Sequence, residues 1–502
     1  MKRLFQNETF LIILILIVAF LVRLYKINTP LADWHSWRQA DTASVTRTYV
    51  ERGINLLFPR YQDVSSIQSG INNPEGYRFV EFPIYNALHT LLTKYLPVFS
   101  LEVWGRLLST ICSLISVYLV FLLGRRFIGK FGGIMAAFFF AFLPYNIFFS
   151  RVILPEPMAV TLGLLALYFF VRFLDRDTAS DLYLSAVAFC FSLLVKPFTI
   201  FYSVPMLYLL VDKFGFKAIF KNGRLLIKLL TFTNIILIPL LLWRFWISLY
   251  PAGMPFFTWA FNGDHIRFRP AFWRWIFGER LGRLILGIWG LVPFSLGVIY
   301  TGKASLPPAC RQGRAGRKNL FVQFFLLGMF LYVSIVATAN VRHDYYQIFT
   351  IPAISLALAA GANYLIKTKE LSKWLAHGLL IFSIGMMLGF AFYDVRGYYN
   401  INHPEIIEAG VALDKIAPKD ALVVAPYNGD TAFLYQTKRW GWPVIDTNID
   451  DIIARGASYY VSVNFDADTN KLMQRFVVIE KTPRYVILNL HKEIKTVPLV
   501  TK

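Results

Sequence analysis

The densest group of polar and aromatic side chains lies just after the first apolar segment of the chain. It reads Asp33-Trp34-His35-Ser36-Trp37-Arg38-Gln39-Ala40-Asp41-Thr42. The carboxylate of Asp41 could act as a general base, and Arg38, about one helical turn before it, could hold an anion beside it. Asp41 followed by Thr-Ala-Ser is also typical of a helix N-cap. A base and a structural cap are therefore two interpretations of the same residue.

Two further carboxylates stand beside prolines, where helices begin. Glu81 precedes Pro83, so it could stabilise the start of a helix, bind a divalent metal or position an acceptor. Glu156 lies between Pro155 and Pro157 and could equally be a first-turn acid at the end of an apolar helix. Both are candidates for substrate binding, with helix stabilisation as the alternative.

Several cations could bind an anionic group such as a phosphate. Lys196 directly precedes Pro197 at the end of an apolar segment, where it could clamp a phosphate or extend its charge to the membrane interface. Arg267 and Arg269 are further candidates in a later loop. The segment Arg342-His343-Asp344-Tyr345-Tyr346 offers Arg342, His343 and Tyr345 as substrate contacts.

The histidines leave a metal site open as a possibility. His35, His265 and His343 are all expected on one side of the membrane together with Glu81, and Glu81 and His265 are the candidate ligands. The sequence has no tight ligand spacing of the H-x-x-x-H kind among them, which favours hydrogen-bonding histidines. A divalent metal ion is the one cofactor that the sequence leaves open.

The elements that must position these residues are membrane helices. Of 502 residues, 56% are hydrophobic and only 16% are charged, which is too apolar for a soluble protein. The net charge of +21 gathers in short loops between apolar runs, which is typical of membrane topology and not of a nucleic-acid surface. We therefore expect membrane lipids, and no nucleic acid, as partners.

A helix needs roughly 20 residues to cross a bilayer, and on that basis about 11 spans are predicted. They lie near residues 9–27, 105–123, 131–149, 156–174, 182–199, 200–212, 226–246, 283–300, 320–339, 346–366 and 375–393. The segment 82–95 is predicted to be a helix on the membrane surface, with Tyr85, His89 and Lys94 open to water, because a crossing there would turn Arg125 and Arg126 outward.

The loop charges predict a multi-pass protein of the cell (inner or plasma) membrane with a cytoplasmic N-terminus. A transmembrane domain would cover residues 1–393, including a first external loop at 28–104, and a second external loop would lie at 247–282. The tail, 394–502, has short strands near 421–425, 459–463, 476–479 and 485–490 and a helix near 404–415. It is predicted to be a small soluble α/β domain on the external or periplasmic side.

Several motifs resemble those of GT-C-type glycosyltransferases. Asp41, Arg47, Gly53 and Phe58-Pro59-Arg60 are similar to the first-loop motif, in which an acidic residue opens a surface helix. Val80-Glu81-Phe82-Pro83 resembles the E-K-P-P stretch of the aminoarabinose transferase and protein O-mannosyltransferase branch. Gly105-Arg106-Leu107 and Leu123-Gly124-Arg125-Arg126 are similar to its next span, and Ser150-Arg151-Val152-Ile153-Leu154-Pro155-Glu156 resembles its R-x-x-L-P-[DE] motif. Thr42 stands where many relatives have a second acid, and Phe82 stands where the aminoarabinose branch has a lysine, so the resemblance does not identify the phosphate-binding cation.

The resemblance implies an all-α polytopic GT-C-type membrane fold that transfers a sugar from a polyprenyl (undecaprenyl or dolichyl) phosphate. The acceptor would be a hydroxyl on protein, lipid or glycan at the external face, attacked with inversion. Such a transfer needs a base, for which Asp41 is chosen, and cations for a leaving group that is already a phosphate. Glu81, Glu156, Lys196 and Arg342 would then contact substrate with Arg38.

Two other classes of protein share part of this pattern. A transporter or flippase of lipid-linked saccharides would also need a polar, basic cavity, but the sequence shows no repeat of the kind that marks transporter halves. An oligosaccharide ligase or polymerase would use a large external loop late in the chain, whereas the richest loop here comes first.

Overall fold

The computed structural model describes residues 7–300 and 319–494. By its internal contacts the chain forms two compact units. We call Met1–Ile27, Arg106–Arg244 and Phe257–Tyr398 the helical unit, and Asn28–Gly105, Phe245–Phe256 and Tyr399–Lys502 the loop–tail unit. The predicted division at residue 393 concerns membrane topology and stays a prediction. Contacts group the tail with the first loop instead of separating them.

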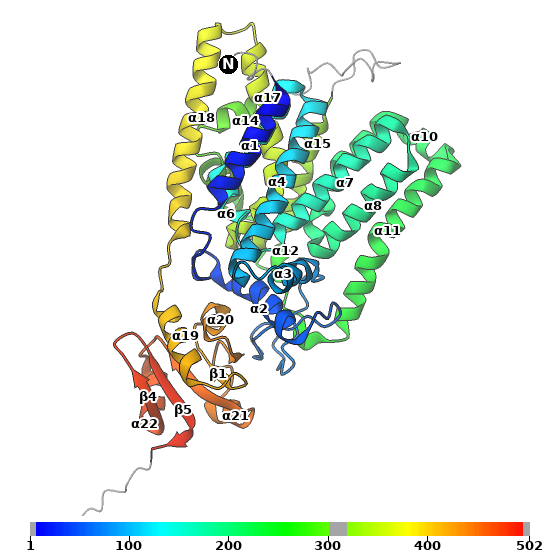
Figure 1. Cartoon of the computed structure of the whole chain (residues 1–502). Coiled ribbons are helices and arrows are strands. Elements are labelled where there is room, and N and C mark those ends of the chain that lie inside the picture. Colours follow the sequence, from blue (N-terminus) through cyan, green and yellow to red (C-terminus); the bar gives the residue numbers. More distant parts are fainter. Residues whose placement is uncertain (1–6, 301–318, 495–502) are drawn as a thin grey trace, which may run out of the picture. The chain divides into compact units, whose positions relative to one another are not determined.

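Apolar helices account for most of the helical unit, drawn in Figure 1. They are α1 (Glu8–Arg23), α4 (Leu101–Phe127), α5 (Lys130–Phe142), α6 (Pro144–Phe149), α7 (Glu156–Arg176), α8 (Ala179–Val195), α9 (Ser203–Phe214), α10 (Phe216–Lys221), α11 (Gly223–Ser248), α12 (Trp259–Asn262), α13 (Pro270–Trp273), α14 (Leu291–Tyr300), α15 (Phe321–Ile335), α16 (Ala337–Arg342), α17 (Ile351–Lys367) and α18 (Lys373–Val395). Short 3-10 helices η1 (Pro197–Tyr202), η3 (Ile266–Phe268), η7 (Asp344–Thr350) and η8 (Arg396–Tyr399) and a π-helix, η4 (Arg274–Ile285), connect them.

Five helices among the described residues are long and apolar enough to cross a membrane: Leu101–Phe127, Glu156–Arg176, Gly223–Ser248, Asp344–Lys367 and Lys373–Tyr399. They match the spans predicted near 105–123, 156–174, 226–246, 346–366 and 375–393. The helices at the other predicted spans are shorter or interrupted, in one case because Pro144 ends α5 and starts α6. The mostly helical membrane fold is confirmed, and the number of spans stays a prediction.

Small residues and buried polar groups hold the helices of this unit together. A Cβ on Gly297 of α14 would lie 1.8 Å from the carbonyl oxygen of Ala357 in α17, so only glycine permits this backbone contact. The two helices lie side by side in Figure 1. Arg23 at the end of α1 is fully buried and donates to Ser150 Oγ at 2.8 Å and to the carbonyl of Ala141 at 3.1 Å.

In the loop–tail unit, the tail forms the predicted α/β structure. Its five-stranded sheet has the order β2-β1-β3-β5-β4, with β1 parallel to β2 and β3, and β5 antiparallel to β3 and β4. The strands are β1 (Leu422–Val424), β2 (Trp440–Trp442), β3 (Ala457–Ser462), β4 (Phe476–Lys481) and β5 (Val486–Glu493). The helices are α19 (Glu405–Ile416), α20 (Thr431–Thr437), α21 (Ile449–Ala454) and α22 (Ala467–Arg475). Among the strands, only β2 was not expected, and of the four helices only α19 was predicted, near 404–415.

The first loop supplies α2 (Ser36–Arg52) and α3 (Ile84–Tyr95), and it extends the tail's sheet. Val64 donates its N–H to the carbonyl of Gly441 in β2 at 3.0 Å, and Gly441 donates to the carbonyl of Gln62 at 2.9 Å. Val64 also packs into the apolar core of the tail with Val424 and Trp442. Loop and tail therefore share one core. The η2 turn (Pro251–Gly253) joins the same unit through the bond from Phe79 N–H to Gly253.

Helix α3 confirms the helix predicted in segment 82–95 (Figure 1). At 12 residues it is shorter than the roughly 20 that a crossing needs. The expectation that Tyr85 and His89 are open to water was wrong, because both are buried and bonded to backbone carbonyls, Tyr85 to Gly105 at 2.8 Å and His89 to Leu101 at 2.6 Å. Burial lowers the pKa of His89 to about 4. Only Lys94 is exposed, as expected.

Candidate active site

Asp41 lies on α2 and is held by two residues distant in sequence. Its side chain is fully buried, and its Oδ2 accepts a hydrogen bond of 2.6 Å from Arg78 Nη2. Its Oδ1 accepts a bond of 2.6 Å from the hydroxyl of Thr431, the first residue of α20. The N-cap of α2 is His35, so the interpretation of Asp41 as a cap is wrong. The buried carboxylate is instead part of a polar cluster.

A second, partly buried ion pair lies beside the first. Arg38, also on α2, pairs with Glu81, which was predicted as a metal ligand or acceptor contact. Arg78 also donates to Gln68 Oε1 at 3.1 Å. One small pocket is lined by all four charged residues together with Thr42, Val45, Pro59, Pro83 and Asn86. Its free volume of about 10 Å³ has room for roughly one water.

The pocket is lined by two carboxylates, each paired with one guanidinium group. Burying a charge is costly unless it is paired and hydrogen-bonded, which explains why each acid has its own arginine. Chemically, the arrangement combines a carboxylate that can take a proton with planar cations that match the oxygens of a phosphate.

Arg78 and Thr431 were not predicted as site residues. For Arg78 a signal existed, because it stands three residues before Glu81 in the stretch that resembles the family motif. Thr431 had none, since it is 390 positions from Asp41 and lies in the tail, where the resemblance is weakest.

Two more acids, the buried Asp63 and the partly buried Asp430, interact electrostatically with Asp41. The pKa of Asp63 is raised to about 6, chiefly by burial and in smaller part by the charge of Asp41, against hydrogen bonds from Ser65 that lower it. Burial likewise raises the pKa of Asp430, the N-cap of α20, to about 6, again with a contribution from Asp41. The loop–tail unit thus gathers three carboxylates around one region of α2.

Glu156 and Lys196 form a buried pair of their own in the helical unit. Glu156 is the first residue of α7 and Lys196 directly follows α8. Lys196 Nζ lies 3.0 Å from Glu156 Oε1, and both side chains are buried. The interpretation of Lys196 as a residue that extends to the interface is wrong, because only 6% of its side chain is exposed. The structure therefore joins two predicted site residues that are 40 positions apart in sequence.

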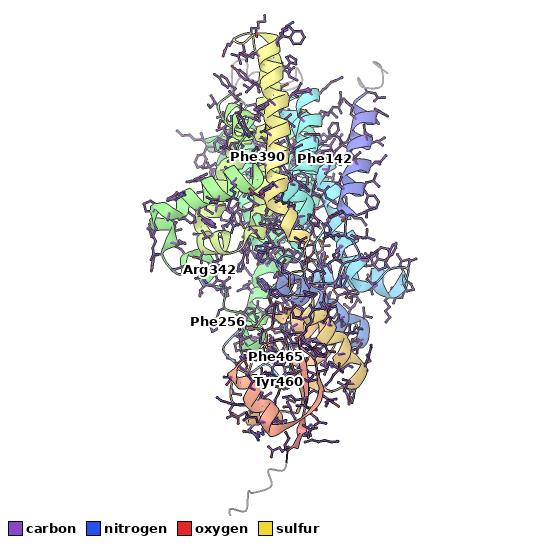
Figure 2. The ribbon with its side chains drawn as sticks, turned by 90° about the vertical axis from the view of Figure 1, so that its left-hand side faces the viewer. Phe142, Phe256, Arg342, Phe390, Tyr460 and Phe465 are labelled. Carbon is purple, nitrogen blue, oxygen red and sulfur yellow. The ribbon has the colours of Figure 1, made fainter. Side chains whose placement is uncertain are left out.

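The segment around Arg342 is less enclosed. Arg342, labelled in Figure 2, is 57% exposed and lies 3.1 Å from Asp264. His343 stacks on Tyr345, with ring centroids 5.6 Å apart, and Tyr345 is buried. Of the other candidates in this region, Arg267 donates to the carbonyl of Ser334 at 3.0 Å.

The described part of the chain does not assemble a metal site. Within 7–300 and 319–494, no group of three or more His, Cys, Asp or Glu side chains is arranged to hold a metal ion. Glu81 pairs with Arg38, and His265 caps the short η3 turn in a left-handed conformation.

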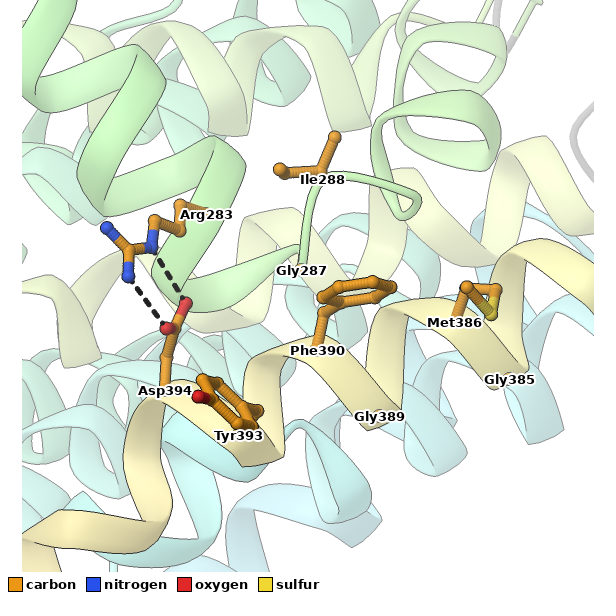
Figure 3. A pocket seen from close by; sticks show the side chains of 9 residues that line it. All are labelled: Arg283, Gly287, Ile288, Gly385, Met386, Gly389, Phe390, Tyr393 and Asp394. Carbon is orange, nitrogen blue, oxygen red and sulfur yellow. Dashed lines mark hydrogen bonds and ion pairs between the residues drawn. The ribbon is translucent and has the colours of Figure 1, made fainter.

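A wider groove lies elsewhere in the helical unit (Figure 3). It has a volume of about 430 Å³ and is lined mostly by apolar or small residues of α18 and the η4–α14 connection. At one end Arg283 binds Asp394 through two bonds of 3.1 and 3.0 Å. Among the described residues that line it, none was predicted to contact substrate.

In sequence the chain matches known proteins over one part only. Residues 83–243 match the family model described as dolichyl-phosphate-mannose-protein mannosyltransferase. No curated protein matches the chain in sequence.

Solved structures match over nearly the whole chain. ArnT from Cupriavidus metallidurans bound to undecaprenyl phosphate shares 12% identity, with a TM-score of 0.63 over 95% of this chain and 97% of ArnT. The Archaeoglobus fulgidus oligosaccharyltransferase in complex with Zn and sulfate shares 12% identity, with a TM-score of 0.51 over 89% of this chain and 67% of that protein. The same enzyme tethered to an acceptor peptide shares 10% identity, with a TM-score of 0.53 over 90% of this chain and 69% of that protein.

Both proteins are GT-C glycosyltransferases. The resemblance predicted from the motifs between Asp41 and Glu156 is thereby confirmed: this chain has the GT-C-type fold and resembles the protein O-mannosyltransferase family over residues 83–243.

Proposed function

We propose that this chain is a membrane glycosyltransferase that moves a sugar from a polyprenyl phosphate carrier to a hydroxyl acceptor, with Asp41 as general base. The observation that carries the proposal is the buried Asp41 carboxylate in one pocket with Arg38 and Arg78. This pocket combines a proton acceptor with cations for a leaving phosphate. Family and fold support the same reaction class.

In the proposed reaction the acceptor oxygen attacks the anomeric carbon from the side opposite the phosphate. The new bond forms between that oxygen and the anomeric carbon, and the bond from the anomeric carbon to the phosphate oxygen breaks, which inverts the configuration. The acceptor's proton moves to Asp41. The phosphate leaves with the electron pair and needs no protonation by an acid, because it is already a stable anion that cations can hold.

Substrate must rearrange the pocket, which has room for roughly one water. An incoming phosphodiester anion is a natural partner for Arg78, whose guanidinium now binds Asp41. If Arg78 exchanges Asp41 for the phosphate, the same movement frees Asp41 Oδ2 to accept a proton. In this proposal Arg78 takes the role of the lysine that the family motif has at the position of Phe82.

The remaining predicted residues have supporting parts in the proposal. In the helical unit the Glu156–Lys196 pair supplies a further cation. Arg342 is exposed to substrate there, with His343 stacked on the buried Tyr345 beside it. The carrier is undecaprenyl or dolichyl phosphate, and the acceptor hydroxyl lies on protein, lipid or glycan. Loop charges support a cell-membrane protein with a cytoplasmic N-terminus and an external loop–tail unit.

Asp41→Asn tests the base. In proteoliposomes with a labelled sugar on a synthetic polyprenyl phosphate, we expect the variant to lose roughly 100- to 10,000-fold in kcat, because an amide of the same shape cannot accept the proton. Asp450→Asn, which replaces an exposed aspartate paired with Arg475, is the matched control and should keep full activity. Full activity in Asp41→Asn would overturn the mechanism.

The same assay separates the rival functions. Movement of the carrier across the bilayer without sugar transfer would establish a transporter, and growth of a chain on the carrier would establish a polymerase. Loss of transfer on adding a chelator, restored by a divalent cation, would show a metal that the described residues do not assemble.

A further inference from the structure

Thr431 links the tail of the chain to Asp41. It is buried, and its hydroxyl donates to Asp41 Oδ1 at 2.6 Å and lies 3.2 Å from the carbonyl of Trp37. All three residues belong to the loop–tail unit, so this contact lies within one compact body. The tail thus supplies one of the two groups that hold the carboxylate.

Helix α20, which carries Thr431, is fixed against the first loop by a second set of bonds. Arg47 of α2 stacks on the ring of Tyr435 at 3.7 Å and donates to the Tyr435 carbonyl at 2.9 Å. The Tyr435 hydroxyl donates to Glu102 at 2.6 Å, and Gln436 donates to the carbonyl of Leu31 at 2.9 Å. The position of the Thr431 hydroxyl is therefore determined by the fold and not by its own bond to Asp41.

We infer that Thr431 is a positioning residue for Asp41 and that the tail completes the active site. This inference rests on the proposed function of Asp41 as base. A carboxylate rotates easily about its last torsion, since that torsion is broad and nearly two-fold. Once Arg78 turns to the phosphate, Thr431 is the group that keeps Oδ1 fixed and Oδ2 directed at the acceptor. Its hydroxyl should then matter for turnover more than for substrate binding.

The test compares three substitutions in the full-length protein. Thr431→Val keeps the shape and removes the hydroxyl, and we expect kcat to fall about 10- to 100-fold while the donor KM changes less than about threefold. Thr431→Ser keeps the hydroxyl and should retain kcat within about threefold. Thr437→Val is the matched control, because Thr437 is a buried residue of the same helix whose hydroxyl bonds only inside the tail among the described contacts, to Leu434 and Arg439.

A merely structural role predicts a different pattern. Thr431→Val would then lower the thermal midpoint without a selective loss of kcat, as Thr437→Val is expected to do, and the inference would be overturned. If Thr431→Val does not fold, Thr431→Cys replaces it, since a thiol is a weak donor of similar size. Wild-type kcat in a folded Cys variant would also overturn the inference.

Combining each change with Asp41→Asn separates this inference from the proposed function. If both hold, Thr431→Val costs nothing further in the residual activity of Asp41→Asn, because the two residues act as one unit. An active Asp41→Asn would contradict the proposed function itself. A crippled Asp41→Asn beside a normal Thr431→Val would contradict only the role of Thr431.

Discussion

Two buried carboxylates, Asp41 in the loop–tail unit and Glu156 in the helical unit, are held by their partners in different ways. In the loop–tail unit, each oxygen of Asp41 accepts a directional hydrogen bond, one from Arg78 and one from Thr431. In the helical unit, Lys196 lies 3.0 Å from Glu156, yet among the described residues neither Glu156 oxygen accepts a bond of good geometry. Asp41 is held in orientation, whereas Glu156 is held mainly by charge. Orientation suits a base, and charge alone suits a residue that keeps a cation in place.

Removing Lys196, the partner of Glu156 in the helical unit, should have the largest effect on stability. Lys196→Met leaves the buried Glu156 without its partner, and we expect it to cost about 3–5 kcal/mol in the free energy of unfolding. Denaturant titration of the protein in mixed micelles measures this cost. The double variant Glu156→Gln with Lys196→Met should recover most of it, since both charges are then gone. A double variant as unstable as the single one would mean that shape, and not charge, holds this pair.

Removing Arg78, the partner of Asp41 in the loop–tail unit, should act chiefly on turnover. Arg78→Met takes away a proposed phosphate ligand, and we expect kcat to fall about 100- to 1,000-fold. Steady-state transfer from the labelled carrier is the measurement. Arg60→Met is the control, because Arg60 lies in the same loop and pairs with Glu75 at a partly exposed position. Equal kcat values for the two variants would exclude Arg78 from the chemistry.

The smallest expected effect concerns the pH dependence of stability. With its pKa raised to about 6 against a usual value near 4, Asp63 binds its proton more tightly in the folded state. Its contribution is therefore present below about pH 4 and is lost as the pH rises to 6 and beyond. Between pH 4 and 7 the wild type should lose roughly 2–3 kcal/mol more than Asp63→Asn.

Denaturant midpoints at several pH values test this difference, with the exposed Asp468→Asn as control. If the stability of Asp63→Asn changes with pH as steeply as that of the wild type, the pKa of Asp63 is not raised in the folded protein, and the prediction is wrong.

Local pattern determined much of this protein before any tertiary contact was known. Apolar runs of about 20 residues give helices such as α4, α7 and α11 because lipid offers no partner for unpaired backbone groups. Short apolar segments in the tail predicted β1 and β3 to β5, and the proline-flanked acids marked where α3 and α7 begin near Glu81 and Glu156.

Only the tertiary structure decided which groups meet Asp41. Arg78 and Thr431 reach it from another part of the loop and from the tail, and Tyr85 and His89 are buried on a helix expected to show them to water. The physical reason is the same in each case: a buried polar group takes whichever partner the chain brings within hydrogen-bond distance. The sequence pattern indicates that a buried polar residue needs a partner. The tertiary structure determines which residue that is, even when, as for Asp41 and Thr431, the two are 390 positions apart.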